Sequence, residues 1–287
     1  MEFGIHSAFH AGSVDLAEFA ARCEQLGFES LWLPEHTVIP VNPSVGPGGA
    51  VGETIPDSYL LMTDPLIGLT VVAAATKTLR LGTGVLLIPE HHPVDLAKRI
   101  SSLDLYSNGR FVLGVGAGWQ PEESAALGGD FLRRWAQTTE SIAVMKKLWT
   151  EDEPEHDGHY YSFPPLKFHP QPVQKPTPPI LLGGGSKRLF DRIAGWADGW
   201  APWSPSPDDV VRGRAALVAA CGAVGRDAGE MSVTAFTGSR DAETIAAFEA
   251  AGVDRLVVTM ASTADRKPFS RVEEIARAAK LALSAGR

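Results

Sequence analysis

Short apolar runs alternate with helical patterns along nearly the whole chain, and this alternation limits the fold more than any other feature. Runs without a polar face are typical of buried parallel strands, and intervening helices provide the crossover connections that parallel pairing needs. We predict eight strands, at 3–9, 30–36, 79–89, 110–119, 179–186, 198–203, 231–238 and 254–260. Eight strand–helix units in 287 residues predict a single α/β domain over 1–287, folded as a closed (β/α)8, or TIM, barrel.

Several helix and turn boundaries are marked by residues with a clear structural preference. In the predicted helix at 14–27, Gly27 suits the carboxyl-terminal cap. In the helix at 64–76, Asp64 is an expected N-cap and Pro65 occupies the first helical position. Asn108-Gly109 predicts a turn into the fourth strand. Further helices are expected at 93–107, 134–149 and 271–285.

Composition excludes several classes of partner. The formal net charge of −8 argues against nucleic acid and against anionic membrane surfaces. No apolar run reaches the ~18 residues of a membrane span, and the first residues do not resemble a signal peptide, so we expect a cytoplasmic protein. Cys23 and Cys221 lie in apolar helical patterns, where buried and inert thiols are expected.

Two inserts interrupt the barrel pattern. Residues 37–63 lie between the second strand and its helix, and residues 151–179 precede the fifth strand. Long segments of this kind in a compact domain are usually lids or binding loops. The first insert follows the carboxyl end of a strand, where barrel enzymes place their active sites. The second is long enough to reach the same face.

Glu35 and His36 end the second predicted strand, directly before the first insert. At that position a carboxylate and an imidazole are expected to face the barrel mouth, and histidine can act as a general acid or base near neutral pH. A histidine held by backbone hydrogen bonds at a strand end is the structural alternative. Position alone does not separate the two.

Glycines interrupt the third and fourth predicted strands. Gly82 and Gly84 indicate a bulge, a close approach of backbone to a ligand, or a tight barrel corner. Gly116 and Gly118 lie in LGVGAGW, which does not continue as a dinucleotide-binding fingerprint. Trp119 at its end can line an aromatic cofactor or pack under a loop.

The strongest binding signal is GGGS, at 183–186, followed by Lys187 and Arg188. Glycines that lead from a strand into a helix expose backbone amides at a helix N-terminus, which is an anion site. This pattern predicts phosphate binding by Gly183, Gly184, Gly185, Ser186 and Lys187. His91-His92 invites a metal interpretation, but no partner lies at ligand spacing, so we expect a surface loop and no metal site.

In order, these motifs resemble the bacterial luciferase-like monooxygenase superfamily. FESLWLPEHTVIP is similar to its second-strand signature, LRLGTGVLLIPEHHPVDLAKRISSLDLYSNGRFVLGVGAGW to its third-to-fourth unit, and PPILLGGGS with WADGW to its fifth-to-sixth unit. The resemblance spans nearly the whole chain. It is greatest to the branch that uses the deazaflavin coenzyme F420.

This resemblance implies roles for particular residues. A non-proline cis peptide at Gly84–Val85 would support the deazaflavin ring, and the Ala117–Gly118 peptide would lie along the cofactor's side chain. His36 would handle a proton beside hydride transfer, with Glu35 in place of the more usual Asp. Trp119 stands where the sugar-phosphate dehydrogenases of the superfamily carry a catalytic Glu, which puts sugar-phosphate oxidation in doubt.

The expected function is therefore an F420-dependent oxidoreductase that transfers a hydride to or from a small organic substrate under the 37–63 insert. The alternative is a monooxygenase that uses FMN reduced by a partner flavin reductase. A non-catalytic flavin-binding protein and a metal-dependent barrel hydrolase are further alternatives. The resemblance also implies a homodimer.

Overall fold

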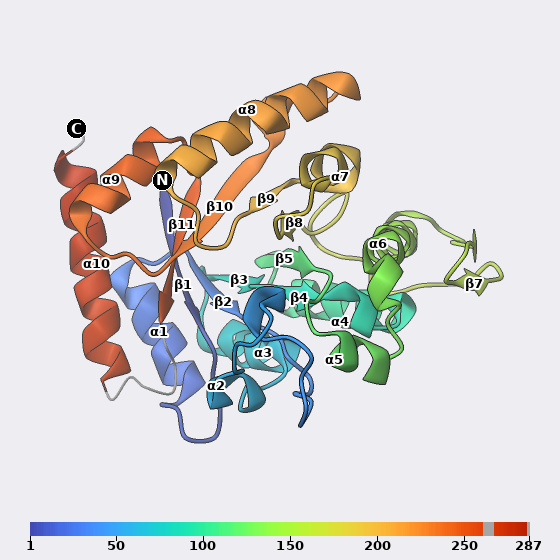
Figure 1. Cartoon of the computed structure of the whole chain (residues 1–287), viewed down its shortest axis with the longest axis horizontal. Coiled ribbons are helices and arrows are strands. Elements are labelled where there is room, and N and C mark those ends of the chain that lie inside the picture. The colour runs from blue at the N-terminus through green and yellow to red at the C-terminus, as the bar shows by residue number, and fades with distance from the viewer. Residues whose placement is uncertain (261–266, 286–287) are drawn as a thin grey trace.

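Nine parallel strands form a closed barrel in the computed structural model, which describes residues 1–260 and 267–285. The strands are β1 (Glu2–Ser7), β2 (Ser30–Leu33), β3 (Arg80–Thr83), β4 (Leu86–Leu87), β5 (Phe111–Gly116), β8 (Ile180–Gly183), β9 (Gly199–Ala201), β10 (Ser232–Thr237) and β11 (Arg255–Met260). The first strand, β1, pairs with the last, β11, and β3 pairs with β5, so the barrel is closed (Figure 1). The expected TIM barrel is confirmed.

β3 and β4 together occupy one strand position, so the barrel has eight positions. Both pair with β5, β3 through Leu81 and Gly82 and β4 through Leu86 and Leu87. Between them the Gly84–Val85 peptide is cis, as the resemblance implied. The third strand is therefore interrupted at the residues expected to support a cofactor.

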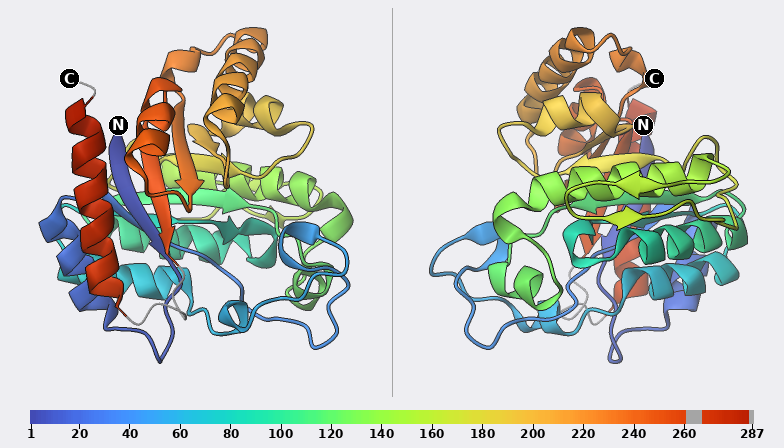
Figure 2. Two further views of the ribbon diagram at one scale, coloured as in Figure 1. Left: turned by 60° about the vertical axis from the view of Figure 1, so that its left-hand side comes forward. Right: turned by 90° about the vertical axis from the view of Figure 1, so that its right-hand side faces the viewer.

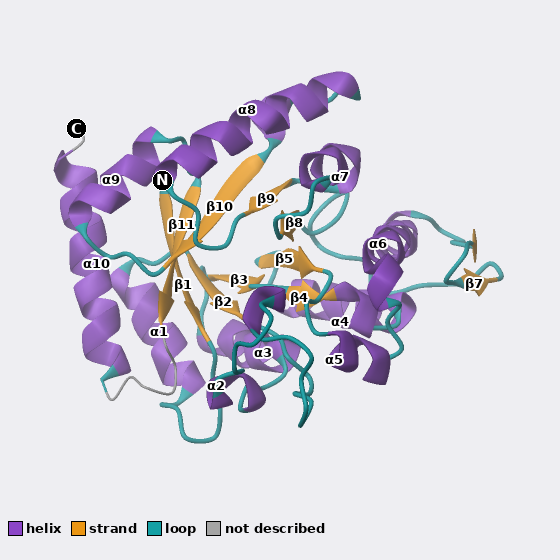
Figure 3. Ribbon diagram, in the orientation of Figure 1, coloured by secondary structure: helices purple, strands orange, loops and turns teal. Residues whose placement is uncertain are grey.

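Helices surround the strands, which lie at the centre of the molecule in Figure 3. They are α1 (Leu16–Leu26), α2 (Asp57–Leu60), α3 (Pro65–Ala75), α4 (Pro93–Tyr106), α5 (Pro121–Ala126), α6 (Arg134–Thr150), α7 (Leu189–Trp196), α8 (Pro207–Ala223), α9 (Ala242–Ala250) and α10 (Pro268–Ala285). The predicted boundaries are confirmed where a residue marked them. Gly27 is left-handed at φ 87°, and the Asp64 side chain accepts from the amide of Ile67 at 2.9 Å. Asn108 and Gly109 both have positive φ in their turn.

The core has two layers. Inside the barrel Trp32, Val112, Leu181, Ala201, Phe236 and Val257 form a buried cluster. A larger cluster lies between the strands and the helices, and includes the buried thiols of Cys23 and Cys221. A Cβ on Gly82 would lie 2.1 Å from the Trp32 ring. The indole of Trp32 therefore occupies the space beside Gly82 inside the barrel.

The two inserts differ in the surfaces they contact. The first is held to the residues around α5, because Glu122 accepts from the amide of Ser44 and Gln120 donates to Val45 O. Figure 2 shows these loops, in blue, beside α5. The second forms the hairpin of β6 (His156–Asp157) and β7 (Ser162–Phe163), and Glu140 of α6 accepts from three of its amides. In Figure 1 this hairpin lies beyond α6, away from the first insert.

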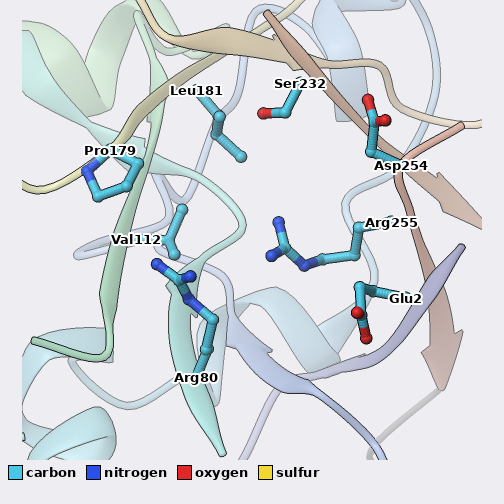
Figure 4. Close-up of a pocket in the computed structure, with 8 residues that line it drawn as sticks. All are labelled: Glu2, Arg80, Val112, Pro179, Leu181, Ser232, Asp254 and Arg255. Carbon is cyan, nitrogen blue, oxygen red and sulfur yellow. The ribbon is translucent and has the colours of Figure 1, made fainter. Parts of the chain in front are cut away.

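A small cavity of about 220 Å³ lies at the amino end of the barrel, where Glu2, Arg80, Ser232 and Arg255 begin their strands (Figure 4). Glu29 binds Arg255 through both carboxylate oxygens, at 2.6 and 2.7 Å. In TIM barrels this end supports stability, whereas chemistry belongs to the opposite face. We therefore assign the cavity to the scaffold.

Candidate active site

Candidate site residues follow the strands at the carboxyl end of the barrel. Several predicted strands end earlier than expected: β2 at Leu33, β5 at Gly116 and β8 at Gly183. Glu35, His36, Ala117 to Trp119 and Gly184 to Lys187 consequently lie in loops. Loops carried by a rigid barrel are the usual position of binding and catalytic groups.

His36 is joined to a carboxylate that the sequence analysis missed. Its Nδ1 lies 2.6 Å from Oε2 of Glu123, in the first turn of α5. The other oxygen, Oε1, accepts from the amides of Thr37 and Val38 at 2.8 and 3.2 Å. Glu123 is 1% exposed, so its carboxylate fixes both the imidazole and the start of the first insert.

Two aromatic rings pack around His36. Its ring centroid lies 5.1 Å from that of Trp119 and 5.2 Å from that of Tyr59, which belongs to α2 of the first insert. The indole of Trp119 thus packs against the imidazole of His36. Tyr59 covers it from the insert, which limits the access of water to this histidine.

Glu35 is buried and makes two close contacts. Oε2 accepts from the amide of Leu87 at 2.6 Å, and Oε1 lies 2.9 Å from Nε2 of His91. The expected surface position of His91 is wrong, because its side chain is only 14% exposed and pairs with Glu35. Burial disfavours the charged imidazole, but the hydrogen bond and the negative charge of Glu35 outweigh it and raise the pKa of His91. Glu35 thus connects the end of β2 to β4, through Leu87, and to the loop that carries His91.

A third carboxyl group, that of Glu90, is buried close to these pairs. It lies in the 3₁₀ turn after β4 and is 7% exposed. Burial, followed by the negative charges of Glu123 and Glu35, raises its pKa to about 9. Glu90 is therefore a neutral carboxylic acid at pH 7.

Val85 brings together three motifs that are far apart in the sequence. A Cβ on Gly116 would lie 2.6 Å from its Cγ2, and a Cβ on Gly183 would lie 3.3 Å from its Cγ1. His6, from β1, contacts the carbonyl oxygen of Gly84 through Nε2 at 3.0 Å. Burial lowers the pKa of His6 to about 4, although this hydrogen bond opposes the shift, so the neutral ring donates to that carbonyl. The third-strand interruption, the fourth-strand glycines and the start of the GGGS loop thus form one surface.

The loop after β8 is open to a ligand. Gly184 and Gly185 are exposed, and Lys187 is exposed beside them. Within the part of the chain that the structure describes, the amides of Gly185, Ser186 and Lys187 have no acceptor. Arg192 of α7 donates to the Ser186 hydroxyl at 2.7 Å and lies over the ring of Trp135. Free amides and a guanidinium group next to a helix N-terminus suit a phosphate.

Over residues 1–260 and 267–285, no group of three or more His, Cys, Asp or Glu side chains could hold a metal ion. The same residues include no helix long and apolar enough to cross a bilayer.

Residues 1–280 match the family described as luciferase-like monooxygenase. The chain belongs to this family. A related uncharacterised protein of Mycobacterium tuberculosis is 35% identical over 211 residues, which is 73% of this chain and 74% of that protein.

Luciferase-like relatives of known activity differ in the cofactor they use. The F420-dependent glucose-6-phosphate dehydrogenase of Amycolatopsis mediterranei is 33% identical over 62% of this chain and 50% of that protein. The oxygenase component of a flavin-dependent trigonelline monooxygenase from Acinetobacter baylyi is 29% identical over 58% of this chain and 42% of that protein. The chain thus spans half or less of the length of these two relatives. It is a luciferase-like oxidoreductase of the flavin or deazaflavin type.

Solved structures share this barrel fold. Monooxygenase RslO1 from Streptomyces bottropensis superimposes with a TM-score of 0.77 at 20% identity, over 100% of both chains. An F420-dependent secondary alcohol dehydrogenase, in complex with an F420-acetone adduct, also gives 0.77, at 16% identity over 97% of this chain and 98% of the other.

The sequence analysis missed Glu123, Glu90, Tyr59 and Arg192. One signal was available for Glu123, since it lies four residues after Trp119 in a short helix at the same barrel end. The others depend on contacts between distant segments and have no local signature.

Proposed function

We propose that this protein is an F420-dependent oxidoreductase that transfers a hydride between the deazaflavin and a small organic substrate, with His36 as the proton-transferring residue. One observation carries the proposal: the His36–Glu123 pair lies at the same barrel end as the surface made by Val85, Gly116 and Gly183. This arrangement puts a positioned acid–base group beside a backbone-lined surface suited to a flat ring system.

The cofactor would supply the hydride donor or acceptor, and the protein would supply the proton transfer. Glu123 holds Nδ1 of His36, and Nε2 has no hydrogen bond within the described part of the chain. Nε2 is therefore the nitrogen that would give a proton to the substrate or take one from it. Trp119 and Tyr59 would exclude water from this exchange. Glu35 acts as a positioning residue in this proposal, because both of its carboxylate oxygens are engaged with Leu87 and His91.

The residues present fit such a cofactor. Val85 would support the ring, and the Ala117–Gly118 peptide would lie along the polar side chain. The amides of Gly185 to Lys187 and the side chain of Arg192 would bind the phosphate. The first insert would close over the substrate, since Tyr59 already contacts His36.

F420 is favoured over FMN because its tail carries additional negative charge. Lys187 and Arg188 are exposed at the phosphate loop, where such a tail would leave the barrel. F420-dependent dehydrogenases among the relatives support the same choice. FMN is the second candidate, favoured by the flavin-dependent monooxygenase relative, and a partner reductase would then reduce the flavin.

The substrate class differs from that of sugar-phosphate dehydrogenases in this proposal. By the resemblance, Trp119 stands where those enzymes carry a catalytic Glu. In this chain the carboxylate that contacts His36 is that of Glu123. A bulky indole next to the imidazole suits an apolar or aromatic substrate better than a sugar phosphate. A homodimer is also part of the proposal, and the mass in solution measured by light scattering tests it.

Equilibrium titration of the purified apoprotein with F420 and FMN, each oxidised and reduced, tests the cofactor assignment. We expect micromolar binding of F420 and weaker binding of FMN. Tighter binding of reduced FMN, with oxygen uptake, would favour the monooxygenase. Binding without turnover over a substrate panel, unchanged by His36→Ala, would indicate a non-catalytic flavin-binding protein. Binding of neither cofactor would contradict the proposal.

A further inference from the structure

Glu90 differs from the other carboxylates of the site because it has no partner. Oε1 and Oε2 of Glu90 are both buried and make no hydrogen bond within residues 1–260 and 267–285. Glu35 and Glu123, by contrast, use both oxygens. A buried polar group without a partner costs about 1–3 kcal/mol, so native proteins rarely keep one without a reason.

Glu90 faces the strip of backbone assigned above to the cofactor's side chain. A Cβ on Gly118 would lie 3.1 Å from Oε1 of Glu90, and Gly118 is in the left-handed region at φ 77°. A larger residue would be strained at Gly118 and would fill the space in front of this carboxyl group. Gly118 thus leaves that space free.

The surroundings restrict what can bind to Glu90. Glu35 lies beyond β2 and Glu123 lies in α5, and both interact with Glu90 electrostatically. Their histidine partners, His36 and His91, are held by those carboxylates and not by Glu90. The negative charges of Glu35 and Glu123 repel a phosphate, which belongs instead at the loop after β8. An uncharged group with hydroxyls, which can both donate and accept, suits Glu90.

We propose that Glu90 hydrogen-bonds the hydroxyl groups of the polyol chain that joins the flavin or deazaflavin ring to its phosphate. The inference rests on the proposed function, but it holds for either cofactor, because both carry such a chain. Glu90 would then set the position of the chain between the ring at Val85 and the phosphate at Ser186.

Matched ligands separate this role from a general structural one. Riboflavin carries the polyol chain without phosphate, and lumiflavin has the same ring with a methyl group instead. A deazaflavin with the same open ribityl chain and its methyl counterpart form the equivalent pair. We would measure dissociation constants of both pairs for the wild type, Glu90→Ala and Glu90→Gln.

We expect Glu90→Ala to weaken binding of the polyol-bearing ligands about tenfold or more, and to leave the methyl ligands within about twofold. Glu90→Gln keeps a neutral donor and acceptor of the same shape, so it should retain most of the affinity. It also serves as the second variant if Glu90→Ala does not fold.

Equal weakening of both members of a pair, or no weakening of either, would overturn the role of Glu90 while the proposed function stands. Failure of all these rings and of both full cofactors to bind the wild type would overturn the proposed function as well. The two failures are therefore distinguishable.

Discussion

His36 and Glu123 lie 87 residues apart in the sequence, and 2.6 Å separates Nδ1 of one from Oε2 of the other. The carboxylate also binds the amides of Thr37 and Val38, so it fixes the tautomer of the imidazole and the start of the insert together. Proton transfer and closure of the site would therefore depend on one buried side chain.

Glu123→Gln should lower kcat by about tenfold to a hundredfold, because an amide neither orients the imidazole as firmly nor stabilises its charged form. The affinity for the cofactor should stay close to wild type, since Glu123 is not in the proposed cofactor surface. Steady-state kinetics over a pH series, together with cofactor titration, check both parts. Loss of cofactor binding with unchanged kcat would show that Glu123 does not act through His36.

Arg192→Gln should weaken phosphate-bearing FMN or F420 about tenfold, because a charge-assisted hydrogen bond to phosphate is lost. Binding of the matched rings without phosphate should not change. For FMN, which lacks the charged tail of F420, Arg188→Gln is a suitable control, because its side chain is 78% exposed and pairs with Asp191. Fluorescence titration measures all three proteins. An equal effect of Arg192→Gln on ligands with and without phosphate would place the phosphate elsewhere.

Glu90→Gln should stabilise the folded protein increasingly as the pH rises. The pKa of Glu90 is raised from 4.5 to about 9, so the folded protein keeps a proton that the unfolded chain releases between these values. The stability that the protonated Glu90 contributes to the folded protein is fully present below pH 4.5, and it is lost as the pH rises to about 9. Glutamine does not titrate, so the difference in Tm between variant and wild type should grow across this range. A difference independent of pH would contradict the neutral state of Glu90.

Gly116→Ala should destabilise the protein by about 1–3 kcal/mol, because the new methyl group would overlap Val85. The distance of 2.6 Å to Val85 Cγ2 leaves no room for it. The double variant Gly116→Ala with Val85→Ala should recover part of this loss, since the obstructing methyl is removed. Denaturant unfolding measures both. Strict additivity of the two changes would mean that the residues do not share this contact.

Local patterns in the sequence predicted the barrel well. Apolar runs located every strand of the barrel, and Gly27, Asp64 and Asn108 marked boundaries that the structure confirms. The strand ends were less predictable, because residues such as Ala117 and Gly184 continue an apolar or glycine-rich run after the ladder has ended.

The candidate site was predictable only where one segment carries the signal. His36 and the GGGS loop could be found from their own motifs. The pairing of His91 with Glu35 depends on how separate loops pack, and no local pattern encodes that packing. The same holds for Glu90, whose buried carboxyl oxygens have no hydrogen-bond partner among the described residues. The indole that fills the space beside Gly82 is a similar case, since register alone brings Trp32 there.

A crystal structure of the protein with bound F420 tests the central claim most directly. The proposal predicts a phosphate on the amides of Gly185 to Lys187, a polyol chain at Glu90, and a deazaflavin ring against Val85 with His36 on its substrate side. A cofactor phosphate bound away from the loop after β8, or a ring outside the mouth formed by Val85, Gly116 and Gly183, would contradict it.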